Sequence, residues 1–169
     1  MSEHYLFKHP AKRYVAVCLD ACGSFWRRLS PRPDKPFDPR GVKKILLIRL
    51  DHLGDVLMVR PALDAVRSYF PEATIDFLLA SDYAALFSYE PRLNLIPVTH
   101  HWFSRHSPWM DQITEIRELI ARLRREHYDL GIDFRGDLRN IALMTLAEIP
   151  ERVGYGITGG GFFLTRQGN

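Results

Sequence analysis

The chain has 169 residues, of which 46% are hydrophobic and 25% are charged. This length suits one well-buried domain, and the composition is that of a folded globular protein rather than a disordered one. The formal net charge of +3, from 23 basic and 20 acidic residues, is too small to indicate nucleic acid as the main partner. The sequence has no run of about 18 apolar residues, so we expect no membrane-spanning helix.

Residues 1–41 differ from the rest and are predicted to form an amino-terminal extension. Within it, residues 14–29 place apolar side chains near helical spacing beside basic ones, and the Pro-rich run at 31–39 is typical of a linker. Such a segment suits a membrane interface, a helix packed on the domain or a loose tail, and its apolar run is too short for a signal peptide. Cys18 and Cys22 can form at most one disulfide and fit a reducing cytoplasm.

From residue 44 onward, strand and helix patterns alternate. The predicted strands are residues 45–48, 74–79, 93–98, 130–134 and 152–155. The predicted helices are residues 55–69, in which Pro61 kinks the helix or restarts its first turn, and residues 82–87, 113–125 and 138–147. In the helix at 113–125, the side chains expected to face inward are Ile113, Ile116, Leu119, Ile120 and Leu123. The alternation predicts an α/β fold, a Rossmann-like doubly wound parallel sheet over residues 42–169.

The turn after the first strand carries two acids, a histidine and a glycine, at Asp51, His52, Gly54 and Asp55. Ligands of open parallel sheets gather beyond the carboxyl ends of the strands, so this turn is a candidate site. Only one glycine of a dinucleotide-binding turn is present and no Walker lysine follows, which argues against NAD and FAD. From spacing alone, the simpler role of Asp55 is to cap the following helix, and Asp51 and His52 equally suit a solvated turn.

A second candidate site is the segment DFRGDLR at residues 133–139. Arg135 and Arg139 are suited to holding a carboxylate or a phosphate by paired hydrogen bonds. Asp137 is expected to cap the helix that follows, and Gly136 to permit the bend before it. The alternative is a capped turn whose arginines point into water.

The loop at residues 100–109 is rich in aromatic and histidine residues. His100, His101 and His106 lack carboxylate partners and regular spacing, so no metal is expected there. Aromatic rings beside Arg105 are better suited to sugar faces or anionic groups, and the alternative is a loop that folds its rings onto the domain.

Residues 44–63 have the sequence KILLIRLDHLGDVLMVRPAL. This stretch resembles the opening of the family nine glycosyltransferases, which include the lipopolysaccharide heptosyltransferases: an apolar strand, a polar pair, Gly-Asp and then Pro-Ala-Leu. The resemblance continues through residues 70–76 and 128–139 in the same order, and covers nearly all of the chain from residue 43 onward.

The resemblance implies the amino-terminal half of a two-domain GT-B fold, which grips a lipopolysaccharide or related glycolipid acceptor while the other half holds a nucleotide-sugar, commonly ADP-heptose. It implies transfer with inversion, with no metal and no cofactor. The general base would be Asp55. The acceptor-binding residues would be Asp51, His52, Gly54, Arg60, Arg135, Asp137 and Arg139. The expected location is the cytoplasm, at the inner face of the inner membrane, with residues 14–29 as a peripheral contact.

The 169 residues contain no donor-binding half, so we expect the chain alone to be a truncated form. It would be inactive, because contacts to the leaving pyrophosphate supply a large catalytic stabilisation. An alternative function is a non-catalytic acceptor-binding module or remnant at the membrane surface. An unrelated Rossmann-like enzyme that uses a phosphorylated nucleotide would explain the sheet but not the order of Gly-Asp and Pro-Ala-Leu.

Overall fold

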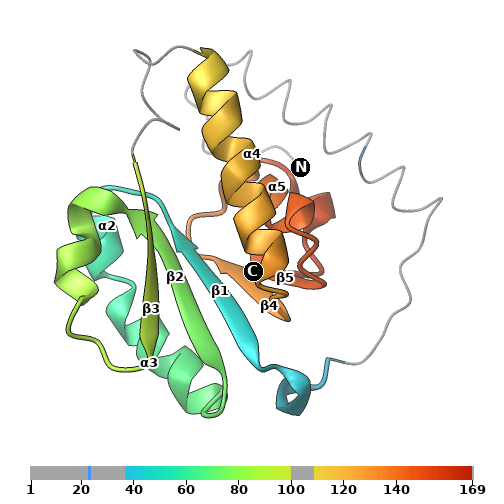
Figure 1. Ribbon diagram of the computed structural model, residues 1–169. Coiled ribbons are helices and arrows are strands. Elements are labelled where there is room, and N and C mark those ends of the chain that lie inside the picture. Colours follow the sequence, from blue (N-terminus) through green and yellow to red (C-terminus); the bar gives the residue numbers. More distant parts are fainter. Residues whose placement is uncertain (1–22, 24–36, 100–108, 169) are drawn as a thin grey trace.

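The computed structural model describes residue 23 and residues 37–99 and 109–168. Its centre is a six-stranded sheet in which all neighbouring strands pair in parallel, in the order β3-β2-β1-β4-β5-β6 (Figure 1). The strands are β1 (Lys44–Arg49), β2 (Thr74–Ala80), β3 (Leu93–Val98), β4 (Leu130–Asp133), β5 (Glu151–Gly154) and β6 (Arg166–Gln167). This is the strand order of a Rossmann-like sheet, which reverses direction between β1 and β4. The predicted α/β, doubly wound parallel sheet is confirmed.

Helices occur at each predicted helical segment, although residues 55–69 divide between two helices and the segment at 82–87 is a 3-10 helix. The α-helices are α2 (Leu53–Leu57), α3 (Arg60–Tyr69), α4 (Trp109–Arg125) and α5 (Leu138–Leu146). The shorter 3-10 helices are η1 (Pro39–Gly41), η2 (Ser81–Phe87) and η4 (Gly161–Phe163). The sequence pattern missed β6, because its two residues are polar and exposed and show no apolar alternation.

Strand β1 is apolar throughout because both faces of the sheet are covered. Ile45 and Leu47 belong to the core on the side of α3, whereas Leu46 and Ile48 belong to the core on the side of α4 and α5. The α3 side also contains Val56, Leu63, Phe77 and Phe87, and the α4 side contains Leu78, Leu119, Leu123 and Ile141. Figure 1 shows α4 crossing one face of the sheet, with α2 and α3 on the other. Burial on both faces fits the continuous apolar run of a parallel strand.

The chain forms two helices over the segment predicted as a helix at residues 55–69, and of the two roles predicted for Pro61 the restarted helix is the one observed. A proline has no N–H to donate to the carbonyl four residues earlier, so Pro61 begins a new helix in the first turn of α3. The first helix starts earlier than predicted, at Leu53, and His52 is its N-cap residue. Asp55 is therefore the third residue of α2 and not the cap, which corrects the prediction from spacing.

Helix α4 buries most of its predicted inner face. Leu119 and Leu123 are buried and Ile116 and Ile120 are half-buried, as expected from their spacing. Ile113 was also expected inside and is 46% exposed. Ile113 lies near the amino end of α4, before the part of the helix that carries the buried Leu119 and Leu123.

Little of the predicted amino-terminal extension is described, and its boundary at residue 41 remains a prediction. Gly23 is helical, and a Cβ there would overlap the ring of Phe162. Phe37 packs edge-on against Phe70, with ring centroids 6.3 Å apart. The rest of the segment at 14–29 lies outside the described residues. Among those described, no helix has the length and apolar character that a membrane span needs.

A buried carboxylate, Asp76, ties three strands together near the amino ends of β1 and β2. Its Oδ1 accepts a hydrogen bond from Asn94 Nδ2 at 2.9 Å, and its Oδ2 accepts one from the Tyr128 hydroxyl at 2.6 Å. Lys44 Nζ lies 3.9 Å from the same Oδ2 and also pairs with Glu126. Burial, followed by the bond to Asp76, raises the pKa of Tyr128, so its hydroxyl stays a donor. The network stabilises the packing of β2 against β1, β3 and the turn before β4.

Replacing Tyr128 with Phe should lower the free energy of unfolding by about 1–3 kcal/mol, because Asp76 would lose a buried donor. Urea unfolding measures the change. Tyr89→Phe is the matched control, since this tyrosine is 94% exposed and its hydroxyl faces water. Equal unfolding energies for the two variants would contradict a stabilising role for the Tyr128 hydroxyl.

Candidate functional site

The two candidate turns of the sequence meet at one edge of the sheet. Strands β1 and β4 are neighbours, with Ile48 opposite Asp133, so the residues that follow each strand emerge side by side. Helix α2 then leads to one face of the sheet and α5 to the other, and Rossmann-like sheets hold their ligands where the strand order reverses in this way. The two candidate sites are therefore parts of one site.

Asp51 joins these turns. Its Oδ1 lies 2.6 Å from Arg135 Nη1, and its Oδ2 lies 3.0 Å from Arg49 Nε. Arg135 Nη1 also donates to the carbonyl of Leu50 at 2.8 Å. Arg49 donates through Nη1 to the carbonyl of Phe134, in the opposite turn. Arg49, at the end of β1, therefore contacts the turn after β4, and Arg135, in the turn after β4, contacts the turn after β1.

Asp55 extends this cluster to the surface. Its carboxylate is 52% exposed and its Oδ1 lies 3.4 Å from Arg49 Nη2. As the third residue of α2, it lies in the first turn, where the helix dipole favours a negative charge. Because His52 occupies the cap position, the Asp55 carboxylate is not committed to capping and is open to solvent. These features are what a base that meets a ligand from solution requires.

Asp137 caps α5, as predicted. Its Oδ1 accepts from the backbone N–H of Arg139 at 2.9 Å, and its Oδ2 lies 2.7 Å from Arg139 Nη2 and 3.5 Å from Arg135 Nε. Burial alone would raise the pKa of Asp137, but the hydrogen bonds and charges of Arg139 and Arg135 outweigh it and hold the pKa below its usual value. Gly136 has a φ of +72°, which confirms its predicted role in the bend.

Asp133 anchors the β4–α5 turn from within, and the sequence pattern did not single it out. It is only 1% exposed and accepts hydrogen bonds from the N–H of Arg135, the N–H of Asp137 and Asn140 Nδ2, at 3.2, 3.0 and 2.9 Å. Burial raises the pKa of Asp133 to about 6, although these bonds oppose the rise. The sequence feature that could have indicated this role is an Asp at the end of a buried strand, followed seven residues later by Asn140 as a possible hydrogen-bond donor.

The remaining predicted residues lie in different surroundings. His52 and Gly54 are exposed, and a Cβ at Gly54 would meet nothing within 4 Å. Arg60 is paired instead with Glu90, in the turn before β3, where Arg67 joins it. A hydrogen bond from Arg67, with further help from Arg60, lowers the pKa of Glu90. The structure thus gathers the Asp51, Asp55, Arg135, Asp137 and Arg139 side chains, and gives Arg60 a separate partner.

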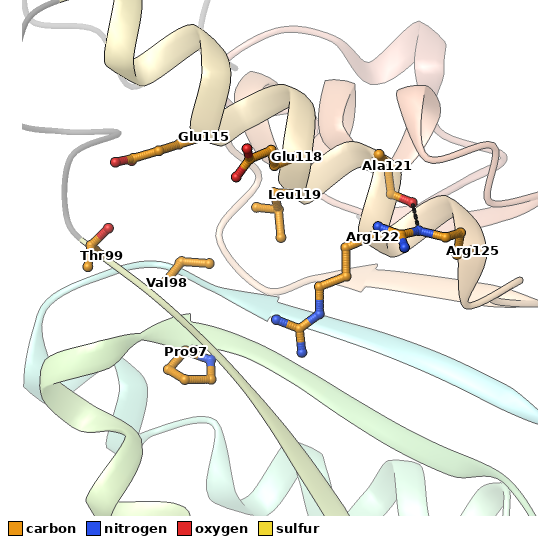
Figure 2. Close-up of a pocket in the computed structure, with 9 residues that line it drawn as sticks. All are labelled: Pro97, Val98, Thr99, Glu115, Glu118, Leu119, Ala121, Arg122 and Arg125. Atoms are coloured by element: carbon orange, nitrogen blue, oxygen red, sulfur yellow. Dashed lines mark hydrogen bonds between the residues drawn. The ribbon is translucent and has the colours of Figure 1, made fainter.

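An open groove of about 700 Å³ lies elsewhere, between the end of β3 and α4 (Figure 2). Its floor includes Pro97 and Val98, and Figure 2 shows Arg122 extending from α4 toward them. Glu115 and Glu118 line it as well, so acids offset its arginines. The groove contains none of the predicted site residues, and its mixed charge selects no class of ligand.

The predicted aromatic loop at residues 100–109 lies outside the described residues except for the backbone of Trp109. The expectation for its histidines and for Arg105 therefore stays a prediction. Within residues 37–99 and 109–168, no group of three or more His, Cys, Asp or Glu side chains is arranged to hold a metal ion.

The chain is similar to known heptosyltransferases. It is 30% identical over 80 residues to lipopolysaccharide heptosyltransferase 3 of Escherichia coli, which is 47% of this chain and 22% of that protein. The structure matches ADP-heptose lipopolysaccharide heptosyltransferase II of Escherichia coli with a TM-score of 0.60 and 25% identity, over 73% of this chain and 34% of that one. A glycosyl transferase family 9 protein of Veillonella parvula matches with a TM-score of 0.63 and 22% identity, over 80% and 37% of the two chains. No protein-family model matches.

The fold and the similarities together define a Rossmann-like domain that resembles part of the known heptosyltransferases. The resemblance to the family nine glycosyltransferases is confirmed, over part of the chain. The chain spans between about a fifth and two-fifths of the length of these relatives.

The burial of Asp133 should make the free energy of unfolding depend on pH. Its pKa rises from 3.8 to about 6 on folding, so the folded state holds its proton more tightly and loses stability as pH rises through that range. We expect the unfolding energy of the wild type, relative to Asp133→Asn, to fall by roughly 2 kcal/mol between pH 4 and pH 6.5. Urea unfolding at several pH values measures the difference, and a difference that stays constant or grows with pH would contradict the assignment.

Proposed function

We propose that this chain is the acceptor-side domain of a GT-B heptosyltransferase-like enzyme. The reaction would transfer a sugar from a nucleotide-sugar, ADP-heptose, to a lipopolysaccharide or related glycolipid. The observation that carries the proposal is the position of Asp55, an exposed carboxylate where the strand order reverses, in the Gly-Asp turn of the resemblance. The likeness to heptosyltransferase II supports it.

In the proposed reaction, Asp55 takes the proton of an acceptor hydroxyl. The hydroxyl oxygen forms a bond to the anomeric carbon of the donor sugar as the bond from that carbon to the diphosphate oxygen breaks. The nucleotide diphosphate leaves with the electron pair, and attack from the opposite side inverts the configuration. An exposed carboxylate suits this role, because the base must come within hydrogen-bond distance of a hydroxyl that arrives from solution.

Acceptor binding would involve Arg135 and Arg139. Their side chains are 32% and 46% exposed, and both already pair with Asp137. A guanidinium has five N–H donors in a planar fork, so a partly exposed arginine can pair with an aspartate and also bind a phosphate or carboxylate from solution. Asp51 and Asp137 would then orient the arginines, and His52 would face the acceptor directly.

Arg60 would have a weaker part in this scheme, because its partner is Glu90. It would bind the acceptor only by exchanging that carboxylate for an anionic group of the glycolipid. The ion pair is exposed on the arginine side, so the exchange costs little.

Donor contacts are proposed to come from a second domain, since the relatives are much longer than the matched region. Nucleotide-sugars are charged and do not cross a bilayer unaided, which places the proposed site in the cytoplasm. A glycolipid acceptor would bring it to the inner face of the inner membrane. Residues 14–29 are proposed as a peripheral contact there.

Asp55→Asn tests the base. Transfer of heptose from ADP-heptose to a heptose-deficient lipopolysaccharide core, measured on the complete product of the gene, should fall by about 10²- to 10⁴-fold. Asp64→Asn is the matched control, because Asp64 is an exposed carboxylate on α3 and should leave the rate unchanged. Wild-type rates in Asp55→Asn would remove Asp55 from the mechanism. Acceptor binding without any transfer would favour a binding module.

Gly54→Ala tests whether the acceptor approaches the backbone of α2. A methyl group there meets open space, so stability should hold or rise by up to about 1 kcal/mol, as for Gly to Ala in a helix. Binding of the acceptor core should nevertheless weaken, because the methyl would occupy the approach to Asp55. Calorimetric titration measures acceptor binding and urea unfolding measures stability. Gly41→Ala is the control, because a Cβ at Gly41 also meets nothing within 4 Å. Unchanged acceptor binding would exclude Gly54 from the contact surface.

A further inference from the structure

We infer that Arg49 is the positioning residue for Asp55, fixing its carboxylate relative to the acceptor-binding turn. The inference rests on the proposed function, in which Asp55 is the base. Arg49 is the last residue of β1, directly before the turn that carries Asp51, and sequence analysis gave it no role. Its side chain is only 15% exposed, so it acts beneath the ligand surface and not on it.

The geometry gives each nitrogen of the Arg49 guanidinium a different partner. Nε lies 3.0 Å from Asp51 Oδ2, Nη1 donates to the carbonyl of Phe134, and Nη2 lies 3.4 Å from Asp55 Oδ1. The Nε contact is an ion pair without an aligned hydrogen bond within the described part of the chain. The contacts to Asp51 and to the Phe134 carbonyl fix the orientation of the guanidinium plane. In that orientation, Nη2 lies next to the carboxylate of Asp55, the proposed base.

Helix α2 by itself gives Asp55 weak support. It has five residues, and Val56 is its one buried side chain. Leu53 and Leu57 on either side of Asp55 are 44% and 45% exposed. A helix this short has little stability of its own, so contacts outside it must hold its position. Among the ion pairs of residues 37–99 and 109–168, the contact from Arg49 is the one that reaches the Asp55 carboxylate.

The same guanidinium connects Asp55 to the anion-binding arginine. Asp51 lies between Arg49 and Arg135, at 3.0 and 2.6 Å, so the orientation of Asp55 depends on the β4–α5 turn through a continuous set of ion pairs. A lysine would supply one point charge in place of the planar fork and could not keep three partners in place.

The experiment is a double-mutant cycle on heptose transfer by the complete gene product. Arg49→Gln should lower kcat roughly ten- to a hundredfold and leave KM for the acceptor within about twofold, because Asp55 would be misplaced while the acceptor contacts remain. Arg49→Lys should fall between Arg49→Gln and the wild type. In the Asp55→Asn background, Arg49→Gln should cause no further loss, because its effect passes through Asp55.

An equal loss of kcat in both backgrounds would overturn the inference, since Arg49 would then act independently of Asp55. A rise in KM with unchanged kcat would overturn it as well, by making Arg49 part of acceptor binding. If the Arg49→Gln variant does not fold, Arg49→Lys replaces it in the double-mutant cycle, and urea unfolding verifies that each variant is folded. Arg124→Gln is the control for removal of an ion-paired arginine, because Arg124 pairs with Glu148 away from Asp55. Wild-type transfer by Asp55→Asn alone would reject the proposed base, which is a separate failure.

Discussion

The ion pair between Asp51 and Arg135 holds together two turns from distant parts of the chain. In a doubly wound sheet these turns diverge, because the helices that follow β1 and β4 pack on opposite faces. Turns that diverge share no packed core that could fix their relative positions. Here a carboxylate with two arginines, Arg49 and Arg135, supplies the missing contact. The relative positions of Asp55 and the β4–α5 turn depend on that arrangement.

The fold could be predicted from the sequence because its signals are local. The apolar strands, the Asp137 cap and the bend at Gly136 each follow from a few adjacent residues, and each is observed. The start of α2 could not be predicted in the same way. Asp55 is a good N-cap residue by type, yet the helix begins two residues before it, at Leu53, with His52 in the cap position and no side-chain cap bond to mark it.

The candidate site was predictable as a meeting of turns but not as a set of contacts. Parallel strands bring their carboxyl ends to one edge, which is enough to place Asp51 near Arg135. Which nitrogen faces which oxygen depends on side-chain conformations that no spacing encodes. For that reason Arg49 and Asp133 were given no role, although the motifs contain both of them.

The sheet contains two buried carboxylates with different surroundings. Asp76 has a cation nearby, since Lys44 Nζ is 3.9 Å away, and it also accepts from Asn94 and Tyr128. Asp133 accepts from neutral donors, so burial dominates its titration. The first stabilises the sheet at the amino ends of its strands, whereas the second shapes the turn that carries Arg135.

The position of Pro97 has a consequence for association between molecules. Strand β3 is at the edge of the sheet and pairs only with β2 in the described part of the chain. An unprotected edge strand offers its backbone to any other extended chain, and proteins limit this with proline, which cannot donate a hydrogen bond. Pro97 lies near the end of β3 and is exposed. It therefore interrupts the ladder that a neighbouring molecule could add along this edge, and so opposes the growth of the sheet into an aggregate.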